Sequence, residues 1–434
     1  MVAEPLERAV LSKVAWRLIP FMFILYIVAY LDRVNVSFAK LTMNKDLGFS
    51  DAVYGLGGGI FFIGYFLFEI PSNLILERVG ARLWIARIMV TWGIISSAMM
   101  LVKGPASFYT LRFLLGAAEA GFFPGMILYL TYWFPARTRA RAVSRFMTGI
   151  PIASVIGGPL SGLILEKMNG TAGWTGWQWL FLIEGVPAMA LGFVVLAFLT
   201  DRPEKARWLA PDERTWLIEH LRREREQKER HQRQTLLGAL SHPKVWLFCL
   251  LYFMLMINLY GVTLWLPQII KQYLGLTNLQ VGLISAVPYL VAAVGMVVIG
   301  RHSDRSGERR WHVTVPACAA ALGLVLIFHL DSPVLVMLGL TLAAVGILGA
   351  LGPFWALPTA FLSGTAAAGG IALVNSVGNL GGFVGPYAMG LIKSLTDSFV
   401  GGLITLAASL VIGALLALSV RHDKVLENSA FSRQ

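Results

Sequence analysis

The chain has 434 residues, of which 56% are apolar and only 14% are charged. Soluble domains carry about 25% charged residues, so this composition excludes an ordinary soluble protein and predicts a membrane protein. The net charge of +12 does not indicate nucleic-acid binding, because the basic residues lie beside apolar segments as membrane anchors do. The short segments of alternating polarity that membrane barrels require are absent from the sequence. The predicted fold class is therefore an all-α membrane protein.

Twelve apolar segments are each long enough for a membrane-spanning helix, which needs about 20 residues. In chain order they cover residues 17–38, 52–73, 82–102, 106–131, 143–166, 177–200, 245–268, 279–300, 311–330, 334–356, 366–392 and 398–420. They divide into an N-terminal six-helix bundle (1–200) and a C-terminal six-helix bundle (245–434), separated by a charged segment (201–244). If the N-terminus is cytoplasmic, the cytoplasmic segments hold 28 of the 36 Lys and Arg residues. This bias predicts that both termini are cytoplasmic.

The first predicted span contains Asp32 and Arg33 side by side, although a charge at the centre of a bilayer costs about 2.5–3.5 kcal/mol on insertion scales. Arg112 and Glu119 lie seven residues apart in the fourth span and so share a helix face. We expect these four residues to share one chamber. The alternatives are a static ion pair between Arg112 and Glu119 and an interfacial pair at Asp32-Arg33. The other acids within spans are interpreted as a partner of a loop motif (Glu69) and as a structural group (Glu184).

The charged segment between the halves contains WLAPDERTWLIEHLRRERE, residues 208–226. Its apolar residues fall on one side of a helix that is expected to start near Pro211: Trp208, Trp216, Leu217 and Leu221. This pattern predicts an amphipathic helix on the inner membrane surface, and a docking site for a partner is the alternative.

The spans of the second half contain no charged residue and offer uncharged polar groups instead. The candidates for substrate contact are Asn258, Tyr260, Trp355, Asn375 and Asn379. Asn375 and Asn379 are one helical turn apart and share a face. Their amides suit a hydroxyl or a second carboxylate, and Trp355 can pack against a carbon frame. The alternative for each is a helix–helix hydrogen bond or core packing.

The two halves repeat each other at an offset of 227 residues. NLILERVGAR (73–82) and GRHSDRSGER (300–309) share an acid-Arg-x-Gly-x-Arg pattern, and Gly158-Pro159 recurs as Gly385-Pro386. Two motifs in one register indicate an ancestral repeat of six spans. The charged members of the two loop motifs are expected to act as gate latches between helix ends: Glu77, Arg78, Arg82, Asp304, Arg305 and Arg309.

The loop motif and its copy resemble the signature of the major facilitator superfamily, and RFLLGAAEAG (112–121) resembles the Arg motif of its fourth span. YLDRVNVSFA, FEIPSNLILERVGAR, DRPEKARWLAPDER, GPFWALPTAFL and NSVGNLGGFVGP are similar to the anion:cation symporter branch, over nearly the whole chain. That branch includes bacterial proton-coupled carriers of tartrate, phthalate and sugar acids. The resemblance therefore implies a major facilitator fold of two pseudo-symmetric bundles, alternating access and proton symport of an organic anion.

The resemblance also implies roles for particular residues. In the family, the residues matching Arg33, Tyr65, Arg112 and Glu119 are linked to substrate and proton handling. One departure is Ile150-Pro151, an apolar pair where sugar-acid carriers of the branch often place an amide. This departure favours an aromatic or shorter acid over a heavily hydroxylated one.

Charge balance suggests how protons and anions would be coupled. With Asp32 and Glu119 ionised, the expected four-residue chamber is neutral. Protonating one acid leaves a charge of +1, which a carboxylate can balance at a freed arginine. Glu119 is the expected site of the coupling proton, and Asp32 is the second candidate.

The expected function is proton-coupled import of a small organic carboxylate across the inner membrane by a monomer embedded in the lipid bilayer. The alternatives are an exchanger or exporter of the same fold and a non-transporting membrane sensor. We predict no enzyme activity, because no span carries a nucleophile with a base. Neither a metal nor a cofactor is expected, since Cys249 and Cys318 lie in apolar segments without a metal-ligand spacing.

Overall fold

The computed structural model describes residues 3–135, 138, 146, 148–230, 241–327, 332–362 and 364–420. Within these residues ten helices are long and apolar enough to cross a membrane. The predicted span 311–330 corresponds to the shorter helix α13 (Arg310–Leu326). The predicted span 366–392 consists of two helices, α15 (Gly364–Asn379) and α16 (Gly381–Thr396). The prediction of an all-α fold with twelve spans is thus confirmed.

The remaining helices follow the predicted order. The N-terminal half contains α1 (Ala3–Leu47), α2 (Asp51–Val79), α3 (Ala81–Ala98), α4 (Pro105–Glu119), α5 (Phe122–Thr131), α7 (Gly149–Lys167) and α8 (Gly176–Phe198). The linking segment contains α9 (Pro211–Arg230). The C-terminal half contains α11 (Pro243–Leu274), α12 (Asn278–Ser306), α14 (Pro333–Phe361) and α17 (Val400–Ser419), besides α13, α15 and α16.

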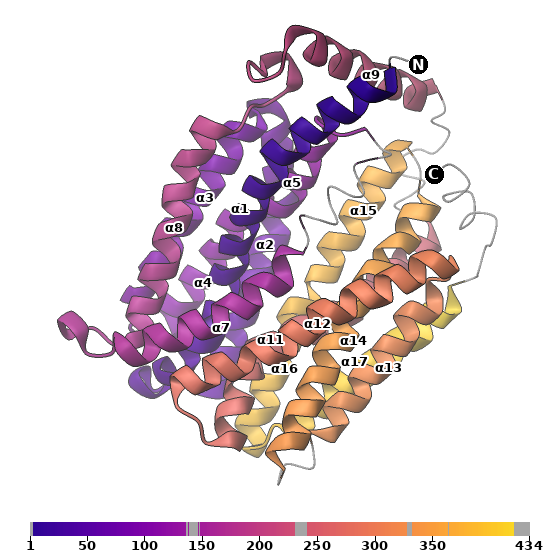
Figure 1. Ribbon diagram of the computed structural model, residues 1–434. Coiled ribbons are helices and arrows are strands. Elements are labelled where there is room, and N and C mark those ends of the chain that lie inside the picture. The colour runs from indigo at the N-terminus through magenta and orange to yellow at the C-terminus, as the bar shows by residue number, and fades with distance from the viewer. Residues whose placement is uncertain are drawn as a thin grey trace.

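The two halves lie side by side, and pairs of helices pack against each other within each half. Figure 1 shows the N-terminal half, from indigo to magenta, next to the C-terminal half, from orange to yellow. Inside the halves, α3 packs against α8 and α13 packs against α14. Helix α9 and the start of α1 lie at one end of the molecule, which we call the α9 end. We call the other end the opposite end.

The fourth predicted span, 106–131, is not one continuous helix. Helix α4 ends at Glu119 and α5 begins at Phe122, because Gly121 adopts the left-handed conformation with φ of 86°. Glycine adopts this conformation without the steric penalty that a Cβ would bring. A Cβ at Gly121 would also overlap Ser72 of α2. The break places Glu119 at the end of a helix inside the membrane region.

The linking segment forms the predicted amphipathic helix, which begins at Pro211 as expected. Leu217 is fully buried, and Trp208 stacks on Trp133 with ring centroids 5.4 Å apart. Lys13 Nζ donates a hydrogen bond to Glu213 at 2.8 Å, and this bond holds the pKa of Glu213 below its usual value. The apolar side of α9 therefore packs against the N-terminal half.

Close backbone contacts join the two halves along α7 with α12 and α2 with α16. A Cβ built on Gly158 would lie 2.5 Å from the carbonyl oxygen of Gly282, and one on Gly55 would lie 2.7 Å from that of Pro386. Such contacts depend on small residues, which let helix backbones touch. Gly55 and Gly282 are 227 residues apart and their partners Pro386 and Gly158 are 228 apart, so nearly equivalent positions of the repeat make these contacts.

Charged side chains also join the halves at the opposite end. Helix α1 continues to Leu47, well beyond its predicted end at residue 38, and carries Lys40 into the interior. Lys40 Nζ lies 2.7 Å from Asp51 Oδ1 and 3.4 Å from the ring centroid of Trp265 in the other half. Lys393 Nζ of α16 lies 3.7 Å from Asp51 Oδ2. These contacts and the glycines close the opposite end.

Replacing Gly282 with valine is expected to weaken this closure, because its side chain would meet the backbone of α7. Spin labels at the exposed residues Lys45 and Thr396, one in each half at the opposite end, should report longer distances in the variant. Gly300→Val in the same helix is the matched control, since nothing lies within 4 Å of a Cβ built there. Equal distance distributions for the two variants would show that the glycine contact does not hold this end closed.

Candidate functional site

Arg33 occupies the boundary between the two halves. Its Nε donates to Glu119 Oε1 of α4 at 3.0 Å, and Nη2 contacts the same oxygen. Its Nη1 donates to the hydroxyl of Tyr260 in α11 at 3.0 Å. The guanidinium also faces the rings of Phe61 and Tyr65, at 5.5 and 5.4 Å from their centroids. One cation of the first half is thus bound to a carboxylate of its own half and a hydroxyl of the other.

Arg112 also lies against the ring of Phe61 but makes no ion pair with Glu119. Its Nε and Nη2 donate to the backbone carbonyls of Gly57 and Gly58 at 3.1 and 3.3 Å. Its guanidinium carbon lies 4.9 Å from the ring centroid of Phe61. Among the described residues, Arg112 Nη1 and Glu119 Oε2 are buried without a hydrogen-bond partner. The static Arg112–Glu119 pair is therefore excluded in this conformation.

Asp32 lies outside this cluster, contrary to the prediction of one four-residue chamber. Its carboxylate accepts hydrogen bonds from Trp92 Nε1 and Ser96 Oγ of α3, both at 2.7 Å, and from Asn35 Nδ2 at 3.2 Å. Asp32 is buried within the N-terminal half, whereas Arg33 faces its boundary. Successive residues of a helix point about 100° apart, which explains the separation. The cluster thus consists of Arg33, Arg112 and Glu119.

Glu69 joins the two halves at a second place, which the sequence did not indicate. It is buried on α2, one turn beyond Tyr65 toward the α9 end. Its Oε1 accepts a hydrogen bond from Asn375 Nδ2 at 2.7 Å, and its Oε2 accepts one from Ser376 Oγ at 2.8 Å. Both donors belong to α15. Glu69 is therefore not a partner of the loop motif but a direct contact with the C-terminal half.

The other candidates of the second half lie in different surroundings. Asn258 is fully buried and donates to Ser409 Oγ of α17 at 2.6 Å, within its own half. Trp355 packs edge-on against Tyr252 with ring centroids 4.8 Å apart. Asn379 is buried at the end of α15, one turn after Asn375. Asn258 thus makes a helix–helix hydrogen bond, which is the alternative to a substrate contact.

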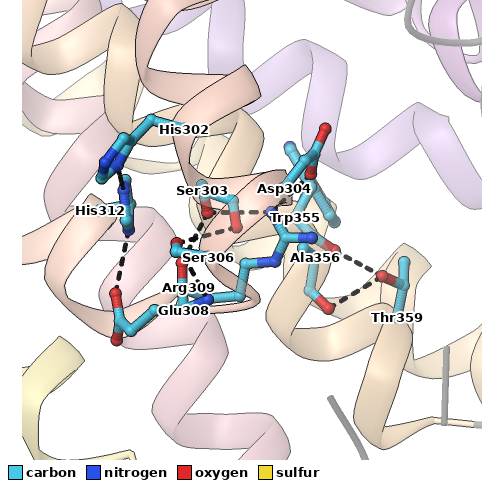
Figure 2. Close-up of polar contacts among 10 residues, drawn as sticks. All are labelled: His302, Ser303, Asp304, Ser306, Glu308, Arg309, His312, Trp355, Ala356 and Thr359. Atoms are coloured by element: carbon cyan, nitrogen blue, oxygen red, sulfur yellow. Dashed lines mark hydrogen bonds and ion pairs between the residues drawn. The ribbon is translucent and has the colours of Figure 1, made fainter. Parts of the chain in front are cut away.

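The two loop motifs lie at the α9 end. Figure 2 shows that Arg309 donates to Asp304 Oδ1 at 2.6 Å and to Ser303 Oγ at 2.9 Å. In the first motif, Glu77, Arg78 and Arg82 have exposed side chains that form no ion pair with another described residue. The backbone amide of Arg82 donates to Asp201 Oδ1 at 2.9 Å instead. Arg305 is also exposed. Within the described residues, neither motif joins the two halves.

A row of titratable side chains beside the second motif was also missed. His302 Nδ1 lies 2.6 Å from His312 Nε2, and His312 Nδ1 lies 3.0 Å from Glu308 Oε2 (Figure 2). Glu308 precedes α13 and His312 lies in its first turn, so their spacing of four residues is the only sequence signal for the row. The row joins the end of α12 to the start of α13.

Buried charges at the boundary of two similar helical bundles, closed together at one end, define a multi-pass membrane transporter. A sequence model described as Major Facilitator Superfamily matches residues 22–386. The chain therefore belongs to the major facilitator superfamily. This membership agrees with the expectation that it is not an enzyme.

Relatives and solved structures agree with this assignment. A "Putative tartrate transporter" of Agrobacterium vitis is 54% identical over 96% of this chain and 92% of its own length. A "Quinolone resistance transporter" of Acinetobacter baumannii is 44% identical over 95% of both chains. The crystal structure of a bacterial homologue of the human lysosomal transporter Spinster, in an inward-facing and unoccupied conformation, has the same fold. It superposes with a TM-score of 0.74 at 17% identity and covers 98% of both chains.

Proposed function

We propose that the protein imports a small organic dicarboxylate, of which tartrate is the model compound, together with a proton. It does so as a monomer in the inner membrane. The α9 end is cytoplasmic in this proposal, as the distribution of Lys and Arg favours. The name of the Agrobacterium vitis relative supports the substrate class.

The observation that carries the proposal is the position of Arg33 between Glu119 and Tyr260. Bidentate pairing with carboxylates is the typical use of a guanidinium at a binding site. The partner now bound to Arg33 is a carboxylate that can be neutralised by one proton. A proton on Glu119 Oε2, the oxygen without a partner among the described residues, would weaken the ion pair and free Arg33 for the substrate.

The charge balance differs from the neutral chamber that the sequence suggested, because Asp32 is not part of the cluster. Counted without Glu69, the residues Arg33, Arg112 and an ionised Glu119 sum to +1, and protonation of Glu119 raises the sum to +2. A dicarboxylate carries the matching charge of −2. Proton and dicarboxylate binding would therefore favour each other, as thermodynamic linkage requires. Arg112 Nη1, the second unpaired group, is a free donor for the bound acid.

Transport requires the cluster to face each side of the membrane in turn. Contacts between the halves close the opposite end in this structure, and the cluster lies between α1, α4 and α11. Rocking of two parallel repeats about a site near the midplane is the usual mechanism of this architecture. We infer that this conformation is closed toward the outside, while the bond between Glu69 and α15 still joins the halves on the cytoplasmic side of the cluster.

Purified protein in liposomes should accumulate labelled L-tartrate when the outside is more acidic than the lumen. With a gradient of one pH unit and no membrane potential, we expect accumulation to approach about tenfold, which is the limit that about 1.4 kcal/mol per proton sets for one proton per tartrate. A protonophore should abolish it. Tartrate entry that responds neither to the gradient nor to the protonophore would contradict proton symport.

Export is the second candidate, and the name of the quinolone resistance relative favours it. The same liposomes distinguish the two when the gradient is reversed. An exporter working by proton exchange would accumulate a quinolone when the lumen is more acidic, whereas the proposed symporter would lose tartrate under that gradient.

A further inference from the structure

The second contact between the halves, Glu69 with α15, has the chemistry of a filled carboxylate-binding site. Each oxygen of the Glu69 carboxylate accepts one short hydrogen bond, from Asn375 and from Ser376. The two donors are neighbours in sequence and are both buried, Asn375 at 7% exposure and Ser376 at 3%. Two adjacent donors on one helix that hold both oxygens of a carboxyl group form a receptor for a carboxylate.

We propose that Asn375 and Ser376 are the subsite for the second carboxylate of the transported acid, and that Glu69 occupies this subsite when the acid is absent. This inference rests on the proposed function and extends it to the specificity for dicarboxylates. Glu69 acts as an internal substitute for the substrate, so a dicarboxylate must displace it.

The position of the subsite relative to Arg33 fits a short diacid. The Tyr65 ring faces the Arg33 guanidinium at 5.4 Å, and Glu69 follows Tyr65 by one turn of α2, about 6 Å along the helix axis. One carboxylate of a diacid at Arg33 and the other at Asn375 would thus lie about one helical turn apart. A monocarboxylate of the same length would leave Glu69 in place.

Displacement of Glu69 has a consequence for the movement of the two halves. Its hydrogen bonds connect α2 of the first half with α15 of the second. A diacid that takes the α15 donors would break this direct connection and replace it with one through the substrate. Binding of the second carboxylate would therefore be coupled to the relative movement of the halves.

The test compares tartrate with threonate, in which one carboxylate of the same four-carbon frame is replaced by a hydroxymethyl group. Binding of both acids to the purified full chain is measured by titration calorimetry. We expect Glu69→Ala to tighten tartrate binding about tenfold, because removing the competing carboxylate frees two donors for a charged ligand. Threonate binding should change less than twofold.

Two further variants test the assignment of the donors. In the Glu69→Ala background, Asn375→Ala together with Ser376→Ala should remove the gain for tartrate and leave threonate binding unchanged. Glu184→Ala is the matched control, since Glu184 is also a buried glutamate but bonds to Ser161 inside the N-terminal half. It should leave the ratio of the two affinities unchanged, and melting curves of every variant verify folding.

The outcomes separate this inference from the proposed function. If the wild-type protein binds neither acid, the proposed function is overturned and the subsite with it. If the wild-type protein binds tartrate through Arg33 but Glu69→Ala leaves the tartrate-to-threonate ratio unchanged or weakens tartrate, only the subsite is overturned. A selective gain for tartrate that requires Asn375 and Ser376 supports it.

Discussion

Replacing Arg33 with alanine is expected to weaken tartrate binding about 100-fold. Hydrogen bonds to charged groups contribute about 1.5–3 kcal/mol, which corresponds to a factor of about 10 to 150 in affinity. The guanidinium group of Arg33 lies at the boundary of the halves and donates hydrogen bonds to Glu119 and Tyr260. Its loss would remove the main cation of the site. Titration calorimetry with L-tartrate measures the effect on the purified variant.

Two further variants separate binding from folding in this prediction. Arg33→Lys keeps the positive charge but loses the planar fork, so its affinity should fall between those of the wild type and Arg33→Ala. Arg33→Ala combined with Glu119→Gln avoids a buried carboxylate without its cation, which by itself is strongly destabilising. If the double variant regains wild-type affinity, Arg33 is a structural partner of Glu119 and not a ligand of the anion.

Much of the architecture follows from the sequence, because lipid imposes a strict rule on the chain. Every backbone polar group inside the bilayer must be hydrogen-bonded, so an apolar run of sufficient length becomes a helix. The repeat offset also holds information about the site. Arg33 and Tyr260 are 227 residues apart and bond to each other. In two parallel repeats, equivalent positions of the first helices lie at the same depth on either side of the symmetry axis, which explains the contact.

The contacts of particular side chains could not be predicted in the same way. Asp32 and Arg33 are adjacent in sequence, and only the packing of α3 against α1 decides that Asp32 meets Trp92. The break after Glu119 arises at Gly121, whose left-handed backbone packs against Ser72. The apolar sequence pattern continues across this break and so does not reveal it. Glu69 and its partners on α15 are about 300 residues apart in the chain. Such a pairing depends on how two halves dock and leaves no local pattern.

The Glu119→Gln variant is expected to lose proton-driven accumulation of tartrate while keeping exchange of labelled for unlabelled tartrate. Glutamine matches the protonated acid in shape and charge, so the trio of Arg33, Arg112 and residue 119 would stay at +2. The anion could still bind and cross, but no proton would accompany it. Accumulation under an acid-outside gradient should fall to the level seen without a gradient, a loss of about tenfold for one pH unit, and counterflow in liposomes without a gradient should remain within about threefold of wild type.

Asp32→Asn is the informative comparison for this variant, because both residues are buried acids of the N-terminal half. The Asp32 carboxylate accepts three hydrogen bonds, whereas Glu119 Oε2 has no partner among the described residues. The Asp32 carboxylate bonds only to groups of the N-terminal half, whereas Glu119 holds Arg33 at the boundary, so only protonation of Glu119 would release a ligand for the substrate. We therefore expect Asp32→Asn to retain gradient dependence. If accumulation survives in Glu119→Gln and disappears in Asp32→Asn, the coupling proton belongs to Asp32, and the pairing of Arg33 with Glu119 only positions the arginine.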